Sequence, residues 1–365
     1  MTIRQIISYL DELAPPSYQE SYDNAGLITG NASWECSGVI CTLDATEEVI
    51  LDAIKKGCNL VVAHHPIVFG GLKKITGRTY VERCVIAAIK NDIAIYAIHT
   101  NLDNIISGVN GKMADKLGLV NRSILLHKQN SLIKLVVFVP ENGVEKVRQA
   151  LFNAGAGQIG NYSECSFSSK GTGTFKPGEG THPHLGEIGI RENASEEKLE
   201  IIFPAFLKEK LIAAMKENHP YEEVAYDLVA LGNVFQEVGS GLIGELDEPM
   251  GALDFLHLVK KQFNLEAIKH TPLTGKMVKK VAICGGAGSF LIKNAVVAGA
   301  DMFITSDVKY HEFFDAENKL VIADIGHWES EQFTIDLLFD VLQAKFPTFA
   351  VQKSEIRTNP VHYLL

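Results

Sequence analysis

Residues 37–66 read SGVICTLDATEEVILDAIKKGCNLVVAHHP, and this stretch decides the fold. A short apolar segment is followed by a stretch with apolar residues at helical spacing, then by Gly57 and a second apolar segment. The pattern predicts a strand, a helix and a second strand that runs parallel to the first. In such units the ligand-binding residues gather where the strands end. His64 and His65 stand at that position.

A second segment, KKVAICGGAGSFLIKNAVVAGADMFITSDVKYH at residues 279–311, repeats the pattern. Polar residues again follow its second strand, among them Asp307, Lys309 and His311. The two segments predict two similar α/β lobes. A common origin does not follow, because any two strand–helix–strand units resemble each other.

The segment between these two units has a different order of predicted strands and helices. Residues 131–232 have the pattern strand, helix, strand, strand, helix, strand, which is typical of a ferredoxin-like α+β sandwich. We therefore expect an α/β core with an inserted domain. The expected boundaries are a first lobe over residues 1–128, the insert over 129–234 and a second lobe over 235–365.

The bulk composition excludes several classes of protein. The formal net charge of −10 argues against general nucleic-acid binding. The six cysteines include no C-x-x-C pair, which favours a reducing compartment and argues against a disulfide framework. No long apolar run predicts a membrane span. We therefore expect a cytoplasmic protein that does not enter membranes.

Histidines and carboxylates follow two further predicted strands. His99 and Asp103 come after one of them, and His327 and Glu331 come after the other. Imidazole and carboxylate groups are the usual ligands of divalent zinc, iron, manganese and nickel. His327 and Glu331 are four residues apart, so in a helix they share one face. The pattern predicts a divalent-metal centre.

The adjacent histidines indicate two neighbouring metals. Successive side chains of an extended strand point to opposite sides, so His64 and His65 do not converge easily on one ion. Asp103 or Glu331 would then bridge two ions. Pro66 restricts His65 to extended geometry, which suits a fixed ligand. The alternative is that each histidine is structural, as a lone histidine near a strand end usually is.

Several weaker signals leave their interpretation open. His99 fits a partner that orients a ligand, or a proton carrier. The turn CGGAGSF at 284–290 fits a phosphate-binding loop or a tight structural turn. Asp23 and Asn24 cap a loop or line the site. The two histidines of THPHLG at 181–186 argue only weakly for a second metal.

With these motifs in view, the chain resembles the GTP cyclohydrolase 1 type 2 family, also called Nif-three-like proteins. The resemblance implies a dinuclear divalent-metal site on the five residues His64, His65, Asp103, His327 and Glu331. Tyr22 departs from the tryptophan that many members carry at that place. The motifs that carry the resemblance, in chain order, are YDNAGLITG, VVAHHPIVFGGLKKITG, AIHTNLDN, CGGAGS, TSDVKYHEF and ADIGHWESE.

The resemblance also implies a function and an assembly. It implies a metal-dependent hydrolase of a nucleotide or related small molecule, a homohexamer, and a PII- or CutA-like insert. In a cyclohydrolase reaction water attacks C8 of a guanine ring and formate is released, with His99 as a candidate proton carrier. The competing hypothesis is a non-catalytic metal-binding protein for storage, delivery or regulation. An interaction scaffold is a third possibility.

Overall fold

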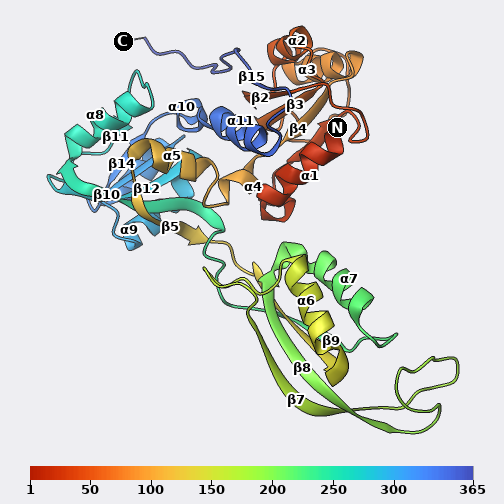
Figure 1. Ribbon diagram of the computed structural model, residues 1–365. Helices are drawn as coiled ribbons and strands as arrows, with labels where there is room; N and C mark the ends of the chain where they lie inside the picture. The colour runs from red at the N-terminus through yellow and green to blue at the C-terminus, as the bar shows by residue number, and fades with distance from the viewer. Residues whose placement is uncertain (365) are drawn as a thin grey trace. The chain divides into compact units, whose positions relative to one another are not determined.

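The structure is a computed structural model that describes residues 1–364 (Figure 1). The chain divides into two compact units. One comprises Met1–His127 and the chain from Gln236 onward, and the other comprises Lys128–Phe235. Both are mixtures of helices and sheets. None of the described helices combines the length and apolar character needed to span a bilayer.

The first unit contains a five-stranded sheet. Strand order is β1 (Gly26–Thr29), β4 (Ala94–Ala97), β3 (Leu60–His65), β2 (Val39–Asp44) and β15 (Val351–Lys353). β15, β2, β3 and β4 run parallel, and only β1 is antiparallel to its neighbour. Helix α2 (Glu47–Lys55) connects β2 to β3, which confirms the first predicted strand–helix–strand unit.

Helices cover both faces of this sheet (Figure 1). On one face α2 and α3 (Tyr80–Lys90) pack on the alternate side chains of the strands, which form one apolar cluster. Tyr96 points to the other face, where its hydroxyl donates to Asp11 of α1 (Ile3–Leu13). α11 (Thr334–Lys345) also packs on β2, β3 and β15. The sheet is therefore buried, as its unbroken apolar strands require.

A six-stranded sheet forms the rest of this unit. The order is β11 (Lys269–His270), β14 (Val321–Asp324), β13 (Met302–Ser306), β12 (Met277–Ala287), β10 (Gly239–Gly251) and β5 (Val120–His127). β12, β13 and β14 are parallel. η4 (Ser289–Leu291) and α9 (Ile292–Val297) connect β12 to β13, which confirms the second predicted unit.

Side chains of this sheet alternate between two cores. Ile283 packs with α5 (Val109–Leu117) and α8 (Ala252–Gln262), whereas Ala282 and Cys284 pack with α9 and η5 (Tyr310–Ala316). Three short helices complete the unit: η1 (Pro16–Tyr18), α4 (Thr100–Asp103) and α10 (His327–Glu331).

Each sheet takes an edge strand from the opposite half of the chain. β5 lies before the insert but pairs with β10 in the six-stranded sheet. β15 lies near the C-terminus but pairs with β2 in the five-stranded sheet. The two lobes are therefore linked by strand exchange as well as by sequence.

The second unit has the predicted order of elements. That order is β6 (Leu132–Pro140), η2 (Glu141–Gly143), α6 (Val144–Ala154), β7 (Ser166–Phe175), β8 (Glu192–Pro204), η3 (Ala205–Leu207), α7 (Lys208–Asn218) and β9 (Tyr226–Ala230). The sheet order is β7-β8-β6-β9, with every neighbouring pair antiparallel. Its apolar face packs on α6 and α7 through residues such as Val137 and Met215.

Shortening a core side chain of β4 tests the packing of helices on the five-stranded sheet. Ile95 is fully buried, whereas Ile89 on the neighbouring α3 is 56% exposed. We expect Ile95→Ala to lower the free energy of unfolding by about 2–5 kcal/mol because it leaves a cavity. Ile89→Ala should change it by less than about 0.5 kcal/mol. Urea unfolding followed by circular dichroism measures both values, and equal losses would contradict the described packing.

Candidate metal centre

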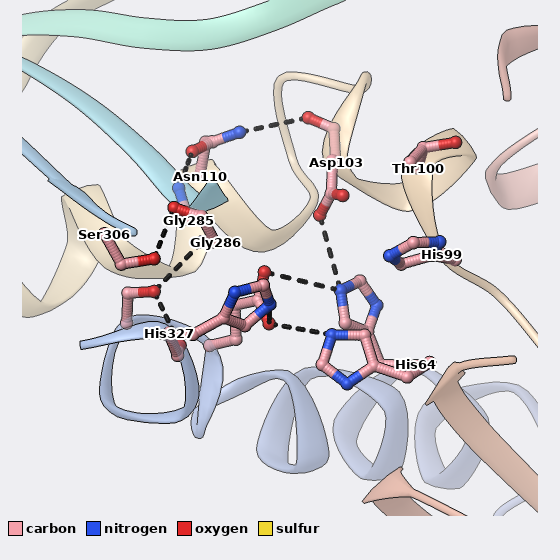
Figure 2. A network of polar contacts seen from close by, with 12 residues as sticks. His64, His99, Thr100, Asp103, Asn110, Gly285, Gly286, Ser306 and His327 are labelled. Atoms are coloured by element: carbon pink, nitrogen blue, oxygen red, sulfur yellow. Dashed lines mark hydrogen bonds and ion pairs between the residues drawn. The ribbon is translucent and has the colours of Figure 1, made fainter. Parts of the chain in front are cut away.

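The ends of three elements meet at one place in the first unit (Figure 2). His64 and His65 end β3, Asp103 ends α4, and His327 begins α10. Because β3 and β14 both pair in parallel with neighbouring strands, the segments that follow them leave at the carboxyl edges of those parallel strands. The ring centroids of His65 and His327 are 5.3 Å apart. Glu331, one turn after His327, is buried between them.

Nitrogen and oxygen atoms converge around the Glu331 carboxylate. His65 Nε2 lies 3.0 Å and His327 Nε2 3.1 Å from Glu331 Oε2. His64 Nε2 lies 3.9 Å from Glu331 Oε1 and 3.6 Å from Asp103 Oδ1. Two ligands of one tetrahedral ion, each ~2.1 Å from it, are separated by ~3.4 Å. The observed spacings bracket that value.

The far nitrogen of each imidazole is already engaged, which turns Nε2 inward. Such outer partners fix the orientation of metal-binding histidines. The three contacts are His64 Nδ1 to Ile98 O at 2.9 Å, His65 Nδ1 to Asp44 Oδ1 at 2.8 Å, and His327 Nδ1 to Asp307 Oδ2 at 2.7 Å.

Four buried polar atoms at this place make no hydrogen bond of good geometry within the described chain, although His65 Nε2 and Glu331 Oε2 approach to the distance of an ion pair. The four atoms are His64 Nε2, His65 Nε2, Asp103 Oδ1 and Glu331 Oε2. A buried polar atom without a partner costs free energy, so native proteins rarely leave one unsatisfied. Four such atoms facing one another would be satisfied by bound cations. The donor set of imidazoles and carboxylates suits divalent metals.

The electrostatics of the metal-free centre point the same way. Burial raises the pKa of Glu331, but His327 and His65 outweigh burial and hold that pKa well below its ordinary value. Burial lowers the pKa of His65 and His327, but the carboxylates beside them raise the two pKa values to about 10 and about 9. Protons on these two rings therefore compensate the buried carboxylate.

Asp103 and His64 respond in the opposite way. Burial, together with the nearby Glu331 carboxylate, raises the pKa of Asp103 well above its ordinary value. Burial lowers the pKa of His64 to about 3, so this ring is neutral and its Nε2 lone pair is available. The centre thus lacks positive charge on the side of Asp103.

His99 faces the same centre with its ring fixed by Asp23. Its Nδ1 lies 2.8 Å from Asp23 Oδ1, and its ring lies 5.2 Å from that of His64 and 5.3 Å from that of His65. Burial raises the pKa of Asp23, but hydrogen bonds from His99 and Thr100 outweigh burial and lower that pKa to about 2. This position beside the centre suits the expected proton carrier. His99 also groups with His64 and His65 as a potential ligand, a role that the sequence did not predict.

The glycine turn after β12 makes room for Glu331. Gly286 has φ +63°, and a Cβ on it would lie 2.3 Å from Glu331 Oε1. The amide of Gly285 donates to Asn110 Oδ1, and the amide of Gly286 donates to Ser330 Oγ. The structure therefore favours the tight turn over a phosphate-binding loop, because both amides are already engaged.

The other predicted residues have different positions. Asp307 orients His327, so it belongs to the surroundings of the centre. Lys309 donates its backbone amide to Glu312, and the His311 ring packs edge-on against Tyr310. In the part of the chain that the structure describes, the histidines of the 181–186 loop join no group of three potential ligands.

Sequence reasoning missed residues that support the centre. Asp44 ends β2 directly opposite His65 in the parallel register, so its place at a strand end was a usable signal. Thr358 in the C-terminal segment donates to Asp44 and accepts from Trp328. Asn359 donates to Glu329 at 2.8 Å. This segment has no regular pattern that would place it beside the centre.

A cavity of about 1170 Å³ opens beside these residues. His65, His99, Asp103, His327 and Glu331 all line it. The centre is therefore at the wall of a space large enough for a small molecule.

This fold and site define an α/β protein with a candidate metal centre at the carboxyl ends of its strands. Residues 1–360 match the family described as Duf34/NIF3 (NGG1p interacting factor 3), and the chain belongs to that family. The match confirms the resemblance that the motifs predict.

Relatives of similar length support this membership. Proteins named "GTP cyclohydrolase 1 type 2 homolog" from Halalkalibacterium halodurans and Bacillus subtilis are 42% and 39% identical to the chain. The first alignment covers 98% of both chains, and the second covers 99% of this chain and 98% of the relative. A crystal structure of a Bacillus cereus protein related to NIF3 has a TM-score of 0.87 at 39% identity, covering 100% of this chain and 99% of that one.

Adding one methyl group at Gly286 should weaken metal binding. In Gly286→Ala the new Cβ displaces the Glu331 carboxylate, so we expect a loss of at least about tenfold in metal affinity, as when an outer partner of a ligand is removed. Gly299→Ala is the matched control, since Gly299 has φ +72° with open space around it. Competition with a chromogenic chelator measures both, and equal affinities would contradict the close approach.

Metal affinity should rise with pH. His65 and His327 have raised pKa values in the metal-free protein, so both are protonated at neutral pH and must lose their protons to bind a cation. Release of two protons lowers the affinity by up to about a hundredfold for each unit of falling pH. Titration calorimetry in buffers of different ionisation enthalpy counts the protons. An affinity unchanged between pH 6 and pH 8 would contradict this account.

Proposed function

We propose that this protein holds two divalent metal ions and uses them to hydrolyse a nucleotide or a related small molecule. The reaction class is that of a GTP cyclohydrolase 1 type 2-like hydrolase. The observation that carries the proposal is the position of Glu331, which belongs to two groups of potential ligands at the wall of a large cavity.

Sharing of Glu331 supports a pair of ions. One group consists of His65, His327 and Glu331, and the other consists of His64, Asp103 and Glu331. The two carboxylate oxygens face different histidines, since Oε2 lies near His65 and His327 and Oε1 lies nearer His64. The donor atoms suit zinc, iron, manganese or nickel.

His99 is the residue that would move a proton. A divalent ion supplies Lewis acidity that lets water give hydroxide near neutral pH. Asp23 accepts from Nδ1 of His99, so the lone pair of the neutral ring lies on Nε2. In hydrolysis of a guanine ring, one water adds to C8 and the C8–N9 bond breaks, which leaves a formamide. A second water then cleaves the remaining C–N bond, so that formate leaves and an amine stays on the ring. His99 Nε2 would take a proton from the water and return it to a ring nitrogen.

A non-catalytic role in metal storage, delivery or regulation is the second candidate. The complete burial of His64 and the near-complete burial of Glu331 favour it, because enclosed ligands suit an ion that is retained. The cavity beside the centre favours catalysis instead, because a store requires no space for a substrate.

The assembly and the insert belong to the same proposal. We propose a cytoplasmic homohexamer. Family membership supports an oligomer, and the six free cysteines favour a reducing compartment. We also propose that the second unit is a PII- or CutA-like domain. The support is its element order and its antiparallel β7-β8-β6-β9 sheet, which is the order of a ferredoxin-like sandwich.

Two substitutions separate catalysis from storage. We expect His65→Ala to lose both bound metal and formate release from guanine compounds, because it removes a ligand. His99→Gln should keep most of the metal and lower turnover about 10²–10⁴-fold, because it removes a proton carrier. His311→Gln is the control, since His311 is exposed and outside the cavity. Elemental analysis and formate release measure the two effects. Full metal content without turnover in the unaltered protein would favour storage.

A further inference from the structure

The walls of the cavity carry a strong charge bias. Asp103 and Glu331 belong to the metal centre. Five further carboxyl groups line the same space, namely Glu20, Asp44, Asp307, Asp324 and Glu329. Within the described chain a single lysine and no arginine lines it. The lysine, Lys269, is engaged, because its Nζ lies 2.6 Å from Asp324 Oδ2.

Bound metal would not reverse this bias. If the histidines are neutral, the seven carboxylates, two divalent cations and Lys269 together carry a net charge of −2. Apart from metal ions, phosphate groups are recognised by arginine, by lysine or by free backbone amides. The amides of Gly285 and Gly286, the turn nearest the centre, already donate to Asn110 and Ser330. A triphosphate would therefore face like charge with few donors.

Several exposed aromatic side chains line the apolar part of the wall. Tyr22, Phe69, Tyr80, Phe290 and Tyr363 all line the cavity and expose between 36% and 71% of their surface. Exposed aromatic side chains gathered around one hollow mark a ligand site, since flat rings stack on them. Carboxylates and aromatic faces also both attract cations.

We propose that the cavity binds a flat aromatic molecule that is uncharged or cationic, and that it discriminates against polyphosphates. A nucleobase or nucleoside has this chemistry, whereas a nucleoside triphosphate does not. The inference rests on the proposed function only in placing the substrate beside the metal centre. The size of the cavity does not exclude a nucleoside triphosphate, because its volume of about 1170 Å³ exceeds the usual ~300–1,000 Å³ of small-molecule sites.

A series of three ligands with increasing phosphate charge tests the charge preference of the cavity. Guanosine, GMP and GTP share one ring and differ in phosphate charge. Titration calorimetry of the metal-loaded full chain at fixed ionic strength gives the three dissociation constants, and elemental analysis afterwards checks that no ligand removed the metal. We expect guanosine to bind at least about tenfold more tightly than GTP, with GMP between them. Tighter binding of GTP, or no binding of guanosine, would overturn the inference.

Two variants test whether the aromatic and acidic side chains of the cavity wall cause this preference. Phe290→Ala should weaken all three ligands about fivefold or more through lost stacking, whereas Phe314→Ala should not, since Phe314 is 65% exposed outside the cavity. Glu20→Gln keeps an oxygen to accept from Asn104 but removes one negative charge. It should narrow the ratio between GTP and guanosine by about twofold to fivefold. An unchanged ratio would contradict the role of the carboxylates.

Binding and turnover report on different proposals. If guanosine, GMP and GTP bind in the expected order of affinity but no formate is released, the proposed hydrolysis is wrong and the charge preference of the cavity is supported. Formate release from GTP at higher kcat/KM than from guanosine would overturn the preference and leave hydrolysis standing.

Discussion

The structure depends on compensation of the buried Glu331 carboxylate. This group is enclosed by imidazoles, and its Oε2 lies 3.0 Å from His65 Nε2 and 3.1 Å from His327 Nε2. A buried charge is tolerated only when positive charge accompanies it. In the metal-free protein the protons of His65 and His327 supply that charge. Gly286 gives the carboxylate room, while Asp44 and Asp307 hold the two rings against it. Each surrounding feature therefore serves the same electrostatic requirement.

Much of the fold follows from local pattern. The two strand–helix–strand units were predictable because their apolar periodicity changes between strand and helix within a short segment. The order of elements in the second unit was predictable for the same reason. The exchange of β5 and β15 between the sheets was not, because edge-strand pairing is decided by distant backbone and leaves no periodic signal. The predicted lobes, each a contiguous stretch of sequence, therefore contain the strand–helix–strand units correctly. They do not give the full composition of the two sheets, because each sheet includes a strand from the other lobe.

The convergence of the site was predictable only where strand ends carried the chemistry. His64, His65, His327 and Glu331 follow buried strands, and parallel strands bring their carboxyl ends to one edge of a sheet. The partner of His65 depends on register, which single-sequence patterns do not give, so Asp44 was overlooked. Thr358 belongs to a segment without regular structure that reaches the centre from the end of the chain. The glycine turn was ambiguous in sequence because a close approach and a phosphate loop require the same residue type.

Anomalous X-ray scattering from crystals grown with a transition metal tests the central claim most directly. If Glu331 is shared between two ions, difference maps at the absorption edge of the metal will show two peaks. Each peak will lie ~2 Å from a Glu331 oxygen, one beside His65 and His327 and the other beside His64 and Asp103. A single peak, or metal bound elsewhere while Glu331 keeps its place between the two protonated rings, would contradict the account.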